Sequence, residues 1–333
     1  MGKINKALIT GITGFVGSHM AEYILSQKDD FEVLGLVRWR APKDNIKDIL
    51  DKITLCYGDL TDAYSLKAIL SRHKPDVIFH LAAQSYVDFS FRAPIATLEA
   101  NVIGTANLLE AVKELKIAQK YDPVMHICSS SETYGQVTED EVPIKEDNPF
   151  RPASPYAVSK VGEDMLAFQY WLSWKIKTIR TRMFTHTGPR RGEVFVVSSF
   201  AKQIAAIEAG KAKPVIKVGN LDSVRTFLDI KDAIRAYWLL VNKCKPGEAY
   251  NIGGVETMTV GQMLDMLLKL SKVKGIKVEV DPERLRPSDV TLQIPCIDKF
   301  VNQTGWKPEI QFSQTLEDIL NYWRTYYKRE GLL

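Results

Sequence analysis

Cysteine and histidine are both scarce in this chain of 333 residues, which contains four cysteines and five histidines. No two cysteines stand in a CxxC spacing, and the histidines show no spacing typical of metal ligands. Cysteines so widely separated are typical of buried free thiols in a reducing compartment. We therefore predict neither disulfide bonds nor a metal site. The cysteines are Cys56, Cys128, Cys244 and Cys296.

Long apolar runs are lacking too, since no stretch approaches the roughly 18 residues of a membrane span. Met1-Gly2-Lys3 leads directly into a short strand-like run, without the apolar core of a signal peptide. Charge is nearly balanced: 44 Lys and Arg against 40 Asp and Glu give a net charge of +4. That excess is too mild to indicate nucleic-acid binding, but basic residues in one cleft would suit an anionic ligand. We predict a soluble cytoplasmic protein that binds neither nucleic acids nor membranes.

What the first half of the chain does contain is an alternation of apolar strand-like runs with amphipathic helical patterns. This alternation is typical of βαβ units that build a parallel sheet. We therefore predict an α/β fold with a Rossmann-type, doubly wound parallel sheet. The expected strands are 7–10, 33–37, 53–55, 77–81, 124–128 and 178–181, and the expected helices are 17–27, 61–72, 97–115 and 154–170.

The pattern loosens after about residue 182. There we recognise glycine and proline turns, one amphipathic helix at 260–271, a strand-like run at 277–280 and a last helix at 312–328. We predict a nucleotide-binding domain of residues 1–181 to which a segment near 224–254 returns. Residues 182–223 and 255–333 are expected to form a smaller, discontinuous substrate-binding lobe.

A glycine-rich loop follows the first expected strand and opens the first helix. Glycines there permit a tight turn and let backbone N–H groups approach a pyrophosphate at the helix N-terminus. Because the loop lies between a strand and a helix, we favour dinucleotide binding over an ordinary turn. The expected cofactor contacts of this loop are Gly11, Thr13, Gly14, Phe15, Val16 and Gly17.

The end of the second strand indicates which dinucleotide is bound. A carboxylate there holds the ribose of NAD, whereas arginines accommodate the 2′-phosphate of NADP. This chain has Arg38 and Arg40 and no acid before Asp44, which favours NADP; the alternative is a pair of solvated surface arginines. We further expect Asp59 and Leu60 at the adenine edge, and Leu81, Ala82 and Ala83 where the cofactor backbone passes closely.

A tyrosine and a lysine stand four residues apart on the helix expected at 154–170. Tyr156 and Lys160 would share one helix face. There the ammonium can stabilise a phenolate, so that Tyr156 acts as a base well below its reference pKa of about 10. The alternative is an ordinary pair of helix residues.

Hydroxyls and one carboxylate follow the apolar run 124–128, at the sheet edge where open α/β folds bind ligands. These residues are Ser129, Ser130, Ser131 and Glu132. Simple alcohol oxidation does not need the carboxylate, which can act as a second base or merely cap the next turn.

Taken together, these segments resemble the extended short-chain dehydrogenase/reductase family over nearly the whole chain. The resemblance rests on the glycine loop, the segment from His80 to Ala83, Asn101, the serine strand and the tyrosine–lysine pair. Segments 188–196, 218–225 and 285–290 are most similar to the GDP-mannose branch, which comprises GDP-mannose 4,6-dehydratase and the reductase that uses its product. Two departures stand out: Phe15-Val16 where the dehydratases have Gln-Asp, and Thr185 in place of an asparagine.

The resemblance implies NADP as cofactor and a GDP-sugar as substrate, dehydrated across C5 and C6 after oxidation at C4. Tyr156 would take the 4-OH proton, Lys160 would hold the nicotinamide ribose, Glu132 would take the C5 proton, and Ser130 would bond the 4-oxyanion. Arg190 and Arg191 are ambiguous, because their loop could instead reach a neighbouring subunit's cofactor phosphate. The implied substrate-binding residues are Ser85, Ser131, Thr185, Arg190, Val218, Arg225, Arg286 and Asp289.

Several alternatives stay open at this point. An NADPH-dependent 4-keto reductase would use Tyr156 as a proton donor and leave Glu132 without a role in C5 chemistry. A nucleotide-sugar 4-epimerase and a catalytically silent NADP-sensing protein are the other two. We also expect homodimers, formed through the helices at 97–115 and 154–170, or homotetramers built from them.

Overall fold

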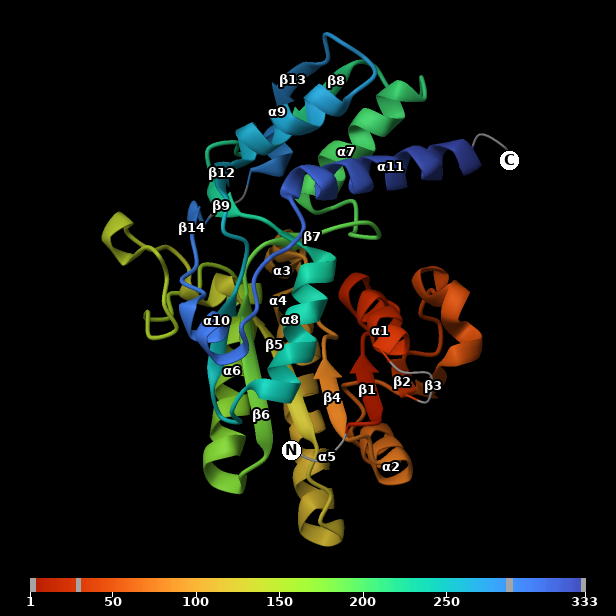
Figure 1. Cartoon of the computed structure of the whole chain (residues 1–333), viewed down its shortest axis with the longest axis vertical. Coiled ribbons are helices and arrows are strands. Elements are labelled where there is room, and N and C mark those ends of the chain that lie inside the picture. The colour runs from red at the N-terminus through yellow and green to blue at the C-terminus, as the bar shows by residue number, and fades with distance from the viewer. Residues whose placement is uncertain (1–3, 28–30, 286–289, 331–333) are drawn as a thin grey trace.

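The computed structural model describes residues 4–27, 31–285 and 290–330. Its centre is a seven-stranded sheet in the order β11-β6-β5-β4-β1-β2-β3, in which every neighbouring pair is parallel (Figure 1). The strand order reverses between β1 and β4, which makes this the switch point of a doubly wound sheet. The predicted α/β fold is thereby confirmed. The strands are β1 (Lys6–Thr10), β2 (Glu32–Val37), β3 (Thr54–Tyr57), β4 (Val77–His80), β5 (Val124–Ser130), β6 (Lys177–Met183) and β11 (Ala249–Ile252).

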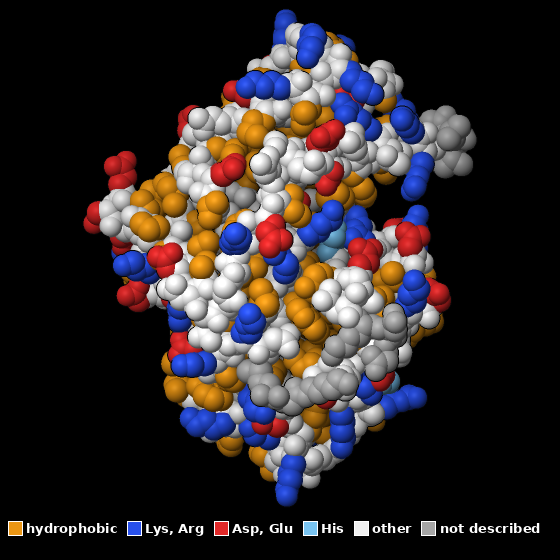
Figure 2. Space-filling view, in the orientation of Figure 1, with side chains coloured by type: hydrophobic (Ala, Val, Ile, Leu, Met, Phe, Trp, Pro, Cys, Tyr) orange, Lys and Arg blue, Asp and Glu red, His pale blue; other side chains and the backbone are white. Residues whose placement is uncertain are grey.

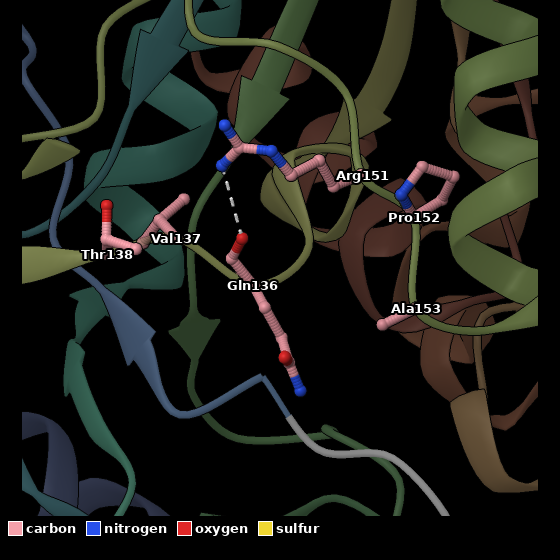
Figure 3. A pocket seen from close by; sticks show the side chains of 6 residues that line it. All are labelled: Gln136, Val137, Thr138, Arg151, Pro152 and Ala153. Carbon is pink, nitrogen blue, oxygen red and sulfur yellow. Dashed lines mark hydrogen bonds between the residues drawn. The ribbon is translucent and has the colours of Figure 1, made fainter.

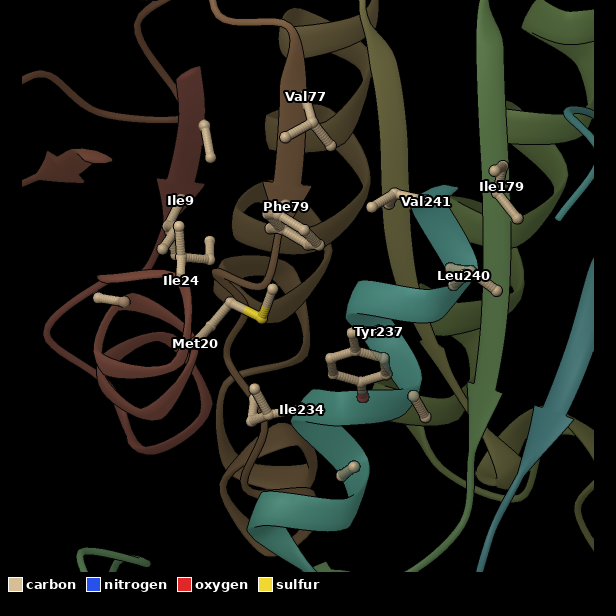
Figure 4. Close-up of a cluster of buried hydrophobic side chains, with 14 of the residues drawn as sticks. Ile9, Met20, Ile24, Val77, Phe79, Ile179, Ile234, Tyr237, Leu240 and Val241 are labelled. Atoms are coloured by element: carbon tan, nitrogen blue, oxygen red, sulfur yellow. The ribbon is translucent and has the colours of Figure 1, made fainter. Parts of the chain in front are cut away.

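Helices cover both faces of this sheet, and in keeping with this the strands β2 and β4 are mostly apolar. On one face, α1 (Phe15–Gln27) and α8 (Ile230–Lys243) enclose a core that includes Ile9, Phe79 and Tyr237 (Figure 4). On the other face, α2 (Ala63–His73), α5 (Gly104–Gln119) and α6 (Pro155–Trp174) pack over a second core. Phe300 of α10 (Asp298–Thr304) and Trp306 join the first core, although they come late in the chain.

A smaller lobe lies beside the carboxyl ends of the strands, at the top of Figure 1. Its core is formed by three helices, α7 (Val196–Glu208), α9 (Val260–Leu270) and α11 (Phe312–Glu330), together with short strands. Two of these strands, β8 (Val215–Val218) and β13 (Lys277–Val280), pair in parallel, and β9 (Val224–Thr226) lies between β12 (Thr257–Thr259) and β14 (Leu292–Gln293). The short strands β7 (His186–Thr187) and β10 (Leu228–Asp229) pair at the junction.

Acidic and basic side chains are interspersed on the face of the molecule shown in Figure 2, over both of its parts. This is in keeping with the small net charge of +4. Within the described part of the chain, no helix is long and apolar enough to cross a bilayer.

Three features differ from the sequence prediction. Strand β5 continues to Ser130, two residues beyond the predicted end, because Ser129 and Ser130 still pair with β6. The single helix predicted at 97–115 is instead α4 (Pro94–Leu98), a π-turn η2 (Glu99–Ile103) and α5. Helices α7, α8 and α10 were not recognised, so the prediction of one helix between residue 182 and the last helix is wrong.

The π-turn has a local cause in the side chain of Asn101, which is almost fully buried. Its Nδ2 donates to Gln84 O at 3.0 Å and to Ser159 Oγ at 2.8 Å, and Gln84 N donates to its Oδ1 at 2.8 Å. Thr105 Oγ1 meanwhile donates to the Asn101 carbonyl oxygen. π-Turns in α-helices are frequent at functional sites, and this one ties the loop after β4 to α6.

Candidate active site

The glycine-rich loop connects β1 to α1 and has the shape its sequence predicts. Gly11 has φ +72°, and a Cβ atom there would lie 2.9 Å from the Ala82 Cα. A Cβ at Gly17 would collide with the Gly11 carbonyl oxygen. Only glycine fits these two positions, so the loop presents bare backbone at the start of α1, where a phosphate binds well.

The segment after β4 is held against this loop by Thr10. Leu81 N and Ala82 N both donate to Thr10 Oγ1 at 3.1 Å, and His80 Nδ1 lies 2.9 Å from the same oxygen. Leu81, Ala82 and Ala83 are therefore brought to the loop as expected, all partly exposed. The small side chains of Ala82 and Ala83 leave the backbone accessible at the switch point of the sheet.

The arginines after β2 extend into solvent. Arg38 and Arg40 are exposed, and neither side chain has an ion pair or hydrogen bond with the residues that the structure describes. Between them Trp39 is 77% exposed and lies against Tyr57, with ring centroids 5.8 Å apart. The short helix η1 (Asp44–Lys52), which follows β2, is tied to the glycine loop, because Asn45 Nδ2 donates to Thr13 O at 2.9 Å.

Asp59 and Leu60 follow the carboxyl end of β3. Asp59 Oδ1 accepts hydrogen bonds from Thr61 N and Thr61 Oγ1, which forms a turn. Leu60 packs against Gly104, and its carbonyl oxygen accepts a hydrogen bond from Asn107. Both residues are partly exposed.

Helix α6 places Tyr156 in its first turn. Ser154 caps the helix, since its Oγ accepts a hydrogen bond from Ala157 N at 3.0 Å, and Pro155 occupies the first helical position. Lys160 lies one turn further on, with Nζ 5.9 Å from the centroid of the Tyr156 ring. Lys160 Nζ also donates to Cys128 O at 2.9 Å, which anchors the ammonium to β5.

Ser130 ends β5 close to this helix. Its hydroxyl lies near enough to the Tyr156 phenol to lower the pKa of that phenol, and it accepts a hydrogen bond from Glu132 N at 3.2 Å. It thereby caps the short helix η3 (Ser131–Tyr134) that follows β5. The structure thus brings Ser130, Tyr156 and Lys160 together, as the sequence predicts.

The electrostatics of Tyr156 differ from the expectation. Burial raises the pKa of Tyr156, while the Lys160 ammonium and the nearby Ser130 hydroxyl lower it. The predicted influence of the ammonium is present, but in the protein alone burial outweighs it. Tyr156 is only 9% exposed, so the cost of forming a phenolate away from water is large.

Glu132 lies in the first turn of η3, next to Ser130. Ser130 caps this turn. The alternative role expected for Glu132, that of a helix cap, is therefore taken by another residue. The Glu132 side chain is partly exposed, unlike Ser130 and Ser131, and has an interaction of its own within the protein. A residue with a carboxylate therefore follows Ser130 closely, with its backbone N–H bonded to the Ser130 hydroxyl.

Comparison with known proteins gives this geometry a family. The family model described as GDP-mannose 4,6 dehydratase matches residues 8–319. The chain belongs to the GDP-mannose 4,6-dehydratase family. The membership that the motifs predict is thereby confirmed.

Two curated relatives illustrate this family and its neighbourhood. GDP-mannose 4,6-dehydratase of Vibrio cholerae serotype O1 is 34% identical over 351 residues, covering 94% of this chain and 92% of the relative. GDP-6-deoxy-D-mannose reductase of Pseudomonas aeruginosa is 32% identical over 325 residues, covering 98% and 99%. The solved structure of RMD from Pseudomonas aeruginosa complexed with NADPH matches with a TM-score of 0.81 and 30% identity, covering 97% of this chain and 99% of that chain.

The substrate-binding residues expected from the resemblance to the dehydratase family fall into distinct places. Ser131 Oγ donates to Gln293 Oε1 at 2.9 Å, which joins the end of β5 to the smaller lobe. Arg225 on β9 donates to Val290 O at 2.8 Å and is partly exposed. Thr185 is partly exposed after β6, and Ser85 is exposed after β4. Arg286 and Asp289 lie outside the described residues.

Val218 is not brought to the site. Its side chain is 0% exposed and packs in the core of the smaller lobe with residues of α7 and α9. Strand β8 presents alternate side chains to that core, and the register places Val218 on the buried face. Only its backbone could meet a ligand, and its carbonyl oxygen already accepts a hydrogen bond from Asp281 N.

Arg190, expected to bind substrate phosphate, has another role. Its guanidinium forms two hydrogen bonds of 2.6 Å with the Glu22 carboxylate and donates to Asn45 O. This bidentate pair ties the loop after β7 to α1 and fully engages the fork of the arginine. The backbone of Arg190 has φ +71°, a left-handed conformation that is uncommon outside glycine.

The sequence left the role of Arg191 undecided, and the geometry favours it as the residue of this loop that binds an anion. Its guanidinium carbon lies 3.7 Å from the Phe195 ring centroid and 5.0 Å from that of Phe15 in the glycine loop. Burial lowers the pKa of Arg191 to about 10, and Tyr156 is the strongest influence that opposes this shift. No described carboxylate pairs with Arg191. Its guanidinium can therefore bind an anion between the glycine loop and Tyr156.

A cavity of about 540 Å³ opens beyond η3 (Figure 3). It is lined by Gln136, Val137, Thr138, Arg151, Pro152 and Ala153. These residues follow Glu132 by a few positions on one side and precede Tyr156 on the other. Arg151 is held in place by two hydrogen bonds of 2.7 Å to Glu141.

The described residues contain no group of three or more His, Cys, Asp or Glu side chains suited to hold a metal ion.

Proposed function

We propose that this protein is an NADP-dependent GDP-mannose 4,6-dehydratase, or a close relative that acts on another GDP-sugar. The observation that carries the proposal is the arrangement at the carboxyl end of β5. There the Ser130 hydroxyl lies near the Tyr156 phenol, Lys160 lies one helix turn away, and Glu132 supplies a carboxylate in a turn that Ser130 caps. An oxidation at C4 needs only the first three groups.

The residues of the chain suit a nicotinamide dinucleotide. The bare glycine loop and the adjacent Arg191 fit a pyrophosphate, and Arg38 and Arg40 favour a 2′-phosphate, hence NADP. The match to a solved structure complexed with NADPH supports the same choice. When bound, this cofactor accepts a hydride from the sugar and returns it.

Each protein group then has one task in the dehydration. Tyr156 takes the proton of the 4-OH, and Ser130 donates a hydrogen bond to the developing 4-oxyanion. Lys160 lowers the cost of the phenolate and holds the nicotinamide ribose. The resulting 4-ketone acidifies the C5 proton, which Glu132 removes and then delivers to the leaving 6-OH as water is lost. Once C6 has been reduced, C5 takes up a proton, and the one that Tyr156 removed from the 4-OH balances the cycle.

The second candidate is the GDP-4-keto-6-deoxy-mannose reductase, favoured by one observation. The reductase of Pseudomonas aeruginosa aligns over 98% of this chain and 99% of its own length, more completely than the Vibrio dehydratase. In that reaction Tyr156 donates a proton to the 4-oxygen, and Glu132 has no step to perform.

Incubation with each of the two candidate substrates separates these functions. We expect purified protein with GDP-mannose and NADP, without added reductant, to release water and form the 4-keto-6-deoxy sugar. Consumption of NADPH with the keto sugar, and no reaction with GDP-mannose, would identify the reductase instead. Inversion at C4 would identify an epimerase, and tight NADP binding without any turnover would identify a silent NADP-sensing protein.

We further propose that the chain divides into a cofactor-binding part (1–181 with 224–254) and a substrate-binding part (182–223 with 255–333). Support comes from β11 and α8, which belong to the large sheet and its first core, and from the separate core of α7, α9 and α11.

We also propose a cytoplasmic homodimer, or a tetramer built from dimers. Support comes from an exposed apolar stripe on α6, formed by Val158, Met165 and Leu172 at intervals of one heptad.

A further inference from the structure

A buried carboxylate contacts the lysine of the site and has no task in the reaction described above. Glu163 lies three residues after Lys160 on α6, and its Oε2 accepts a hydrogen bond of 2.9 Å from Lys160 Nζ. The two side chains are only 1% and 5% exposed. Ion pairs this deeply buried lose much of their hydration and are seldom needed for stability alone.

The contacts of the ammonium show what the pair does locally. Lys160 has three N–H donors, of which one goes to Cys128 O and one to Glu163 Oε2. Together they fix the direction of the ammonium and leave one donor for a ligand beside Tyr156. The other oxygen, Glu163 Oε1, is buried without a hydrogen-bond partner among the described residues.

The charges around the pair are few. Asp164 is next to Glu163 in sequence, but its carboxylate is paired with Arg180 and Arg182 of β6. From the sheet, Cys128 and the buried His80 and His126 face Lys160. Opposite α6, Arg191 and Tyr237 act on Tyr156 and its surroundings. Glu163 is therefore the anion that acts most strongly on Lys160.

The two partners influence each other in opposite ways. Burial disfavours the charge of Lys160, but Glu163, Tyr156 and Cys128 together hold the pKa of Lys160 above its ordinary value. Burial raises the pKa of Glu163 to about 7, although Lys160 opposes that rise. Glu163 also raises the pKa of Tyr156.

We propose that Glu163 is a positioning residue for Tyr156, which orients the Lys160 ammonium and offsets part of its charge, and so sets the pH range in which Tyr156 exchanges protons. The inference rests on the proposed function only in taking Tyr156 as the acid–base residue. With Glu163 ionised, Lys160 stabilises a phenolate less; with Glu163 neutral, its full charge acts on Tyr156. The ionisation of Glu163 is thereby linked to proton exchange at Tyr156.

The variant Glu163→Gln tests the proposal because it removes the charge and retains an oxygen that can accept from Lys160. We expect the pH–rate profile to move to lower pH by about one unit at its acidic limb, since Tyr156 ionises more easily. The alkaline limb should move down as well, because Lys160 loses the anion that holds its proton. A merely structural role would lower the rate at every pH without moving either limb.

A second measurement does not need any substrate. The phenolate absorbance of Tyr156, obtained as the difference between the protein and its Tyr156→Phe variant, should titrate about one unit lower in the Glu163→Gln background. This readout tests Glu163 even if GDP-mannose proves not to be a substrate. Glu114→Gln, which removes a half-exposed carboxylate paired with Lys67, is the control and should leave the titration unchanged.

Glu163→Asp places the carboxylate one methylene further from the ammonium and should give a smaller shift in the same direction. If Glu163→Gln does not fold, the aspartate variant carries the test. A midpoint for Tyr156 equal to that of the unmodified protein, in whichever of the two variants folds, would overturn the proposal.

Discussion

At the scale of single residues, the site is decided by which charged groups are already paired within the protein. Adjacent arginines illustrate this: Arg190 is held by Glu22, whereas Arg191 contacts two aromatic rings and pairs with no carboxylate of the described residues. The sequence left both arginines ambiguous and placed only Arg190 among the expected substrate-binding residues, because which of two neighbours finds a distant partner depends on the tertiary fold. Glu163 was not recognised for the same reason, since its burial beside Lys160 arises only when α6 packs on β5.

Glu132 is the residue on which dehydration depends in the proposed function. We expect Glu132→Gln to reduce dehydration of GDP-mannose by about 10²-fold or more, because the C5 proton loses its base. Binding of NADP should be unaffected, since Glu132 is not among the residues expected to contact the cofactor. Product formation followed by mass spectrometry gives the rate, and fluorescence titration gives the affinity for NADP.

The matched control for Glu132→Gln is Glu139→Gln, an exposed glutamate in the following short helix η4 (Glu139–Glu141). It should dehydrate the sugar at the rate of the unmodified protein. Full activity of Glu132→Gln would exclude this residue from the mechanism and favour a different base at C5.

At the scale of secondary-structure elements, sequence patterns predicted best where both faces of an element are buried. Strands β1, β2, β4 and β5 are continuous apolar runs ending in turns, so their positions were predicted within a residue or two. The pattern was less informative for α8, whose apolar face covers the sheet although it follows a loop-rich stretch. The π-turn at Asn101 was not predictable, because its partners Gln84 and Ser159 come from two other elements.

The exposed stripe on α6 leads to a prediction about assembly. Val158 and Met165 are 47% and 37% exposed, and Ile103, in the adjacent η2, is 51% exposed. We expect Val158→Asp, combined with Met165→Asp, to convert a dimer into monomers, because two charges per subunit would lose their hydration in the interface. Light scattering coupled to gel filtration measures the mass.

Val255 provides the control for the assembly experiment, because it is 65% exposed and lies in the loop after β11. Val255→Asp should leave the mass unchanged. A protein that is monomeric before any substitution would contradict the proposed dimer directly.

At the scale of the whole molecule, the histidines make stability depend on pH. Burial lowers the pKa of His80, His126 and His186 to about 3 each and that of His19 to about 4. In the unfolded chain these groups titrate near 6.5, so below that pH the unfolded state binds more protons than the folded state. Stability is therefore lost as the pH falls from about 6.5.

Glu163 acts in the opposite sense, because its pKa of about 7 lies above the unfolded value. The folded state gains stability from this group as the pH falls from about 7 to about 4.5. One carboxyl group cannot offset four imidazoles, each of which contributes up to about 1.4 kcal/mol per pH unit. We expect the free energy of unfolding to fall by at most about 4 kcal/mol per pH unit near pH 5.

Urea unfolding at a series of pH values between 8 and 5 measures this slope. His126→Gln should reduce it by about 1 kcal/mol per pH unit, since one buried imidazole is removed. A slope unchanged by that substitution would mean that His126 does not titrate on unfolding. The measurement is made without ligand, because bound cofactor would add its own pH dependence.

The chain crosses several times between the large sheet and the smaller lobe, and this has a practical consequence for anyone who wishes to divide the protein. After β6 the chain enters the smaller lobe, returns to supply α8 and β11, leaves again for α9 and comes back once more with Phe300 and Trp306. A fragment ending at residue 181 would lack the edge strand β11 and α8, one of the two helices that cover one face of the sheet. Neither part can therefore be expressed alone as a stable module, and a reporter or affinity label is better inserted in an exposed turn such as that at Gly210.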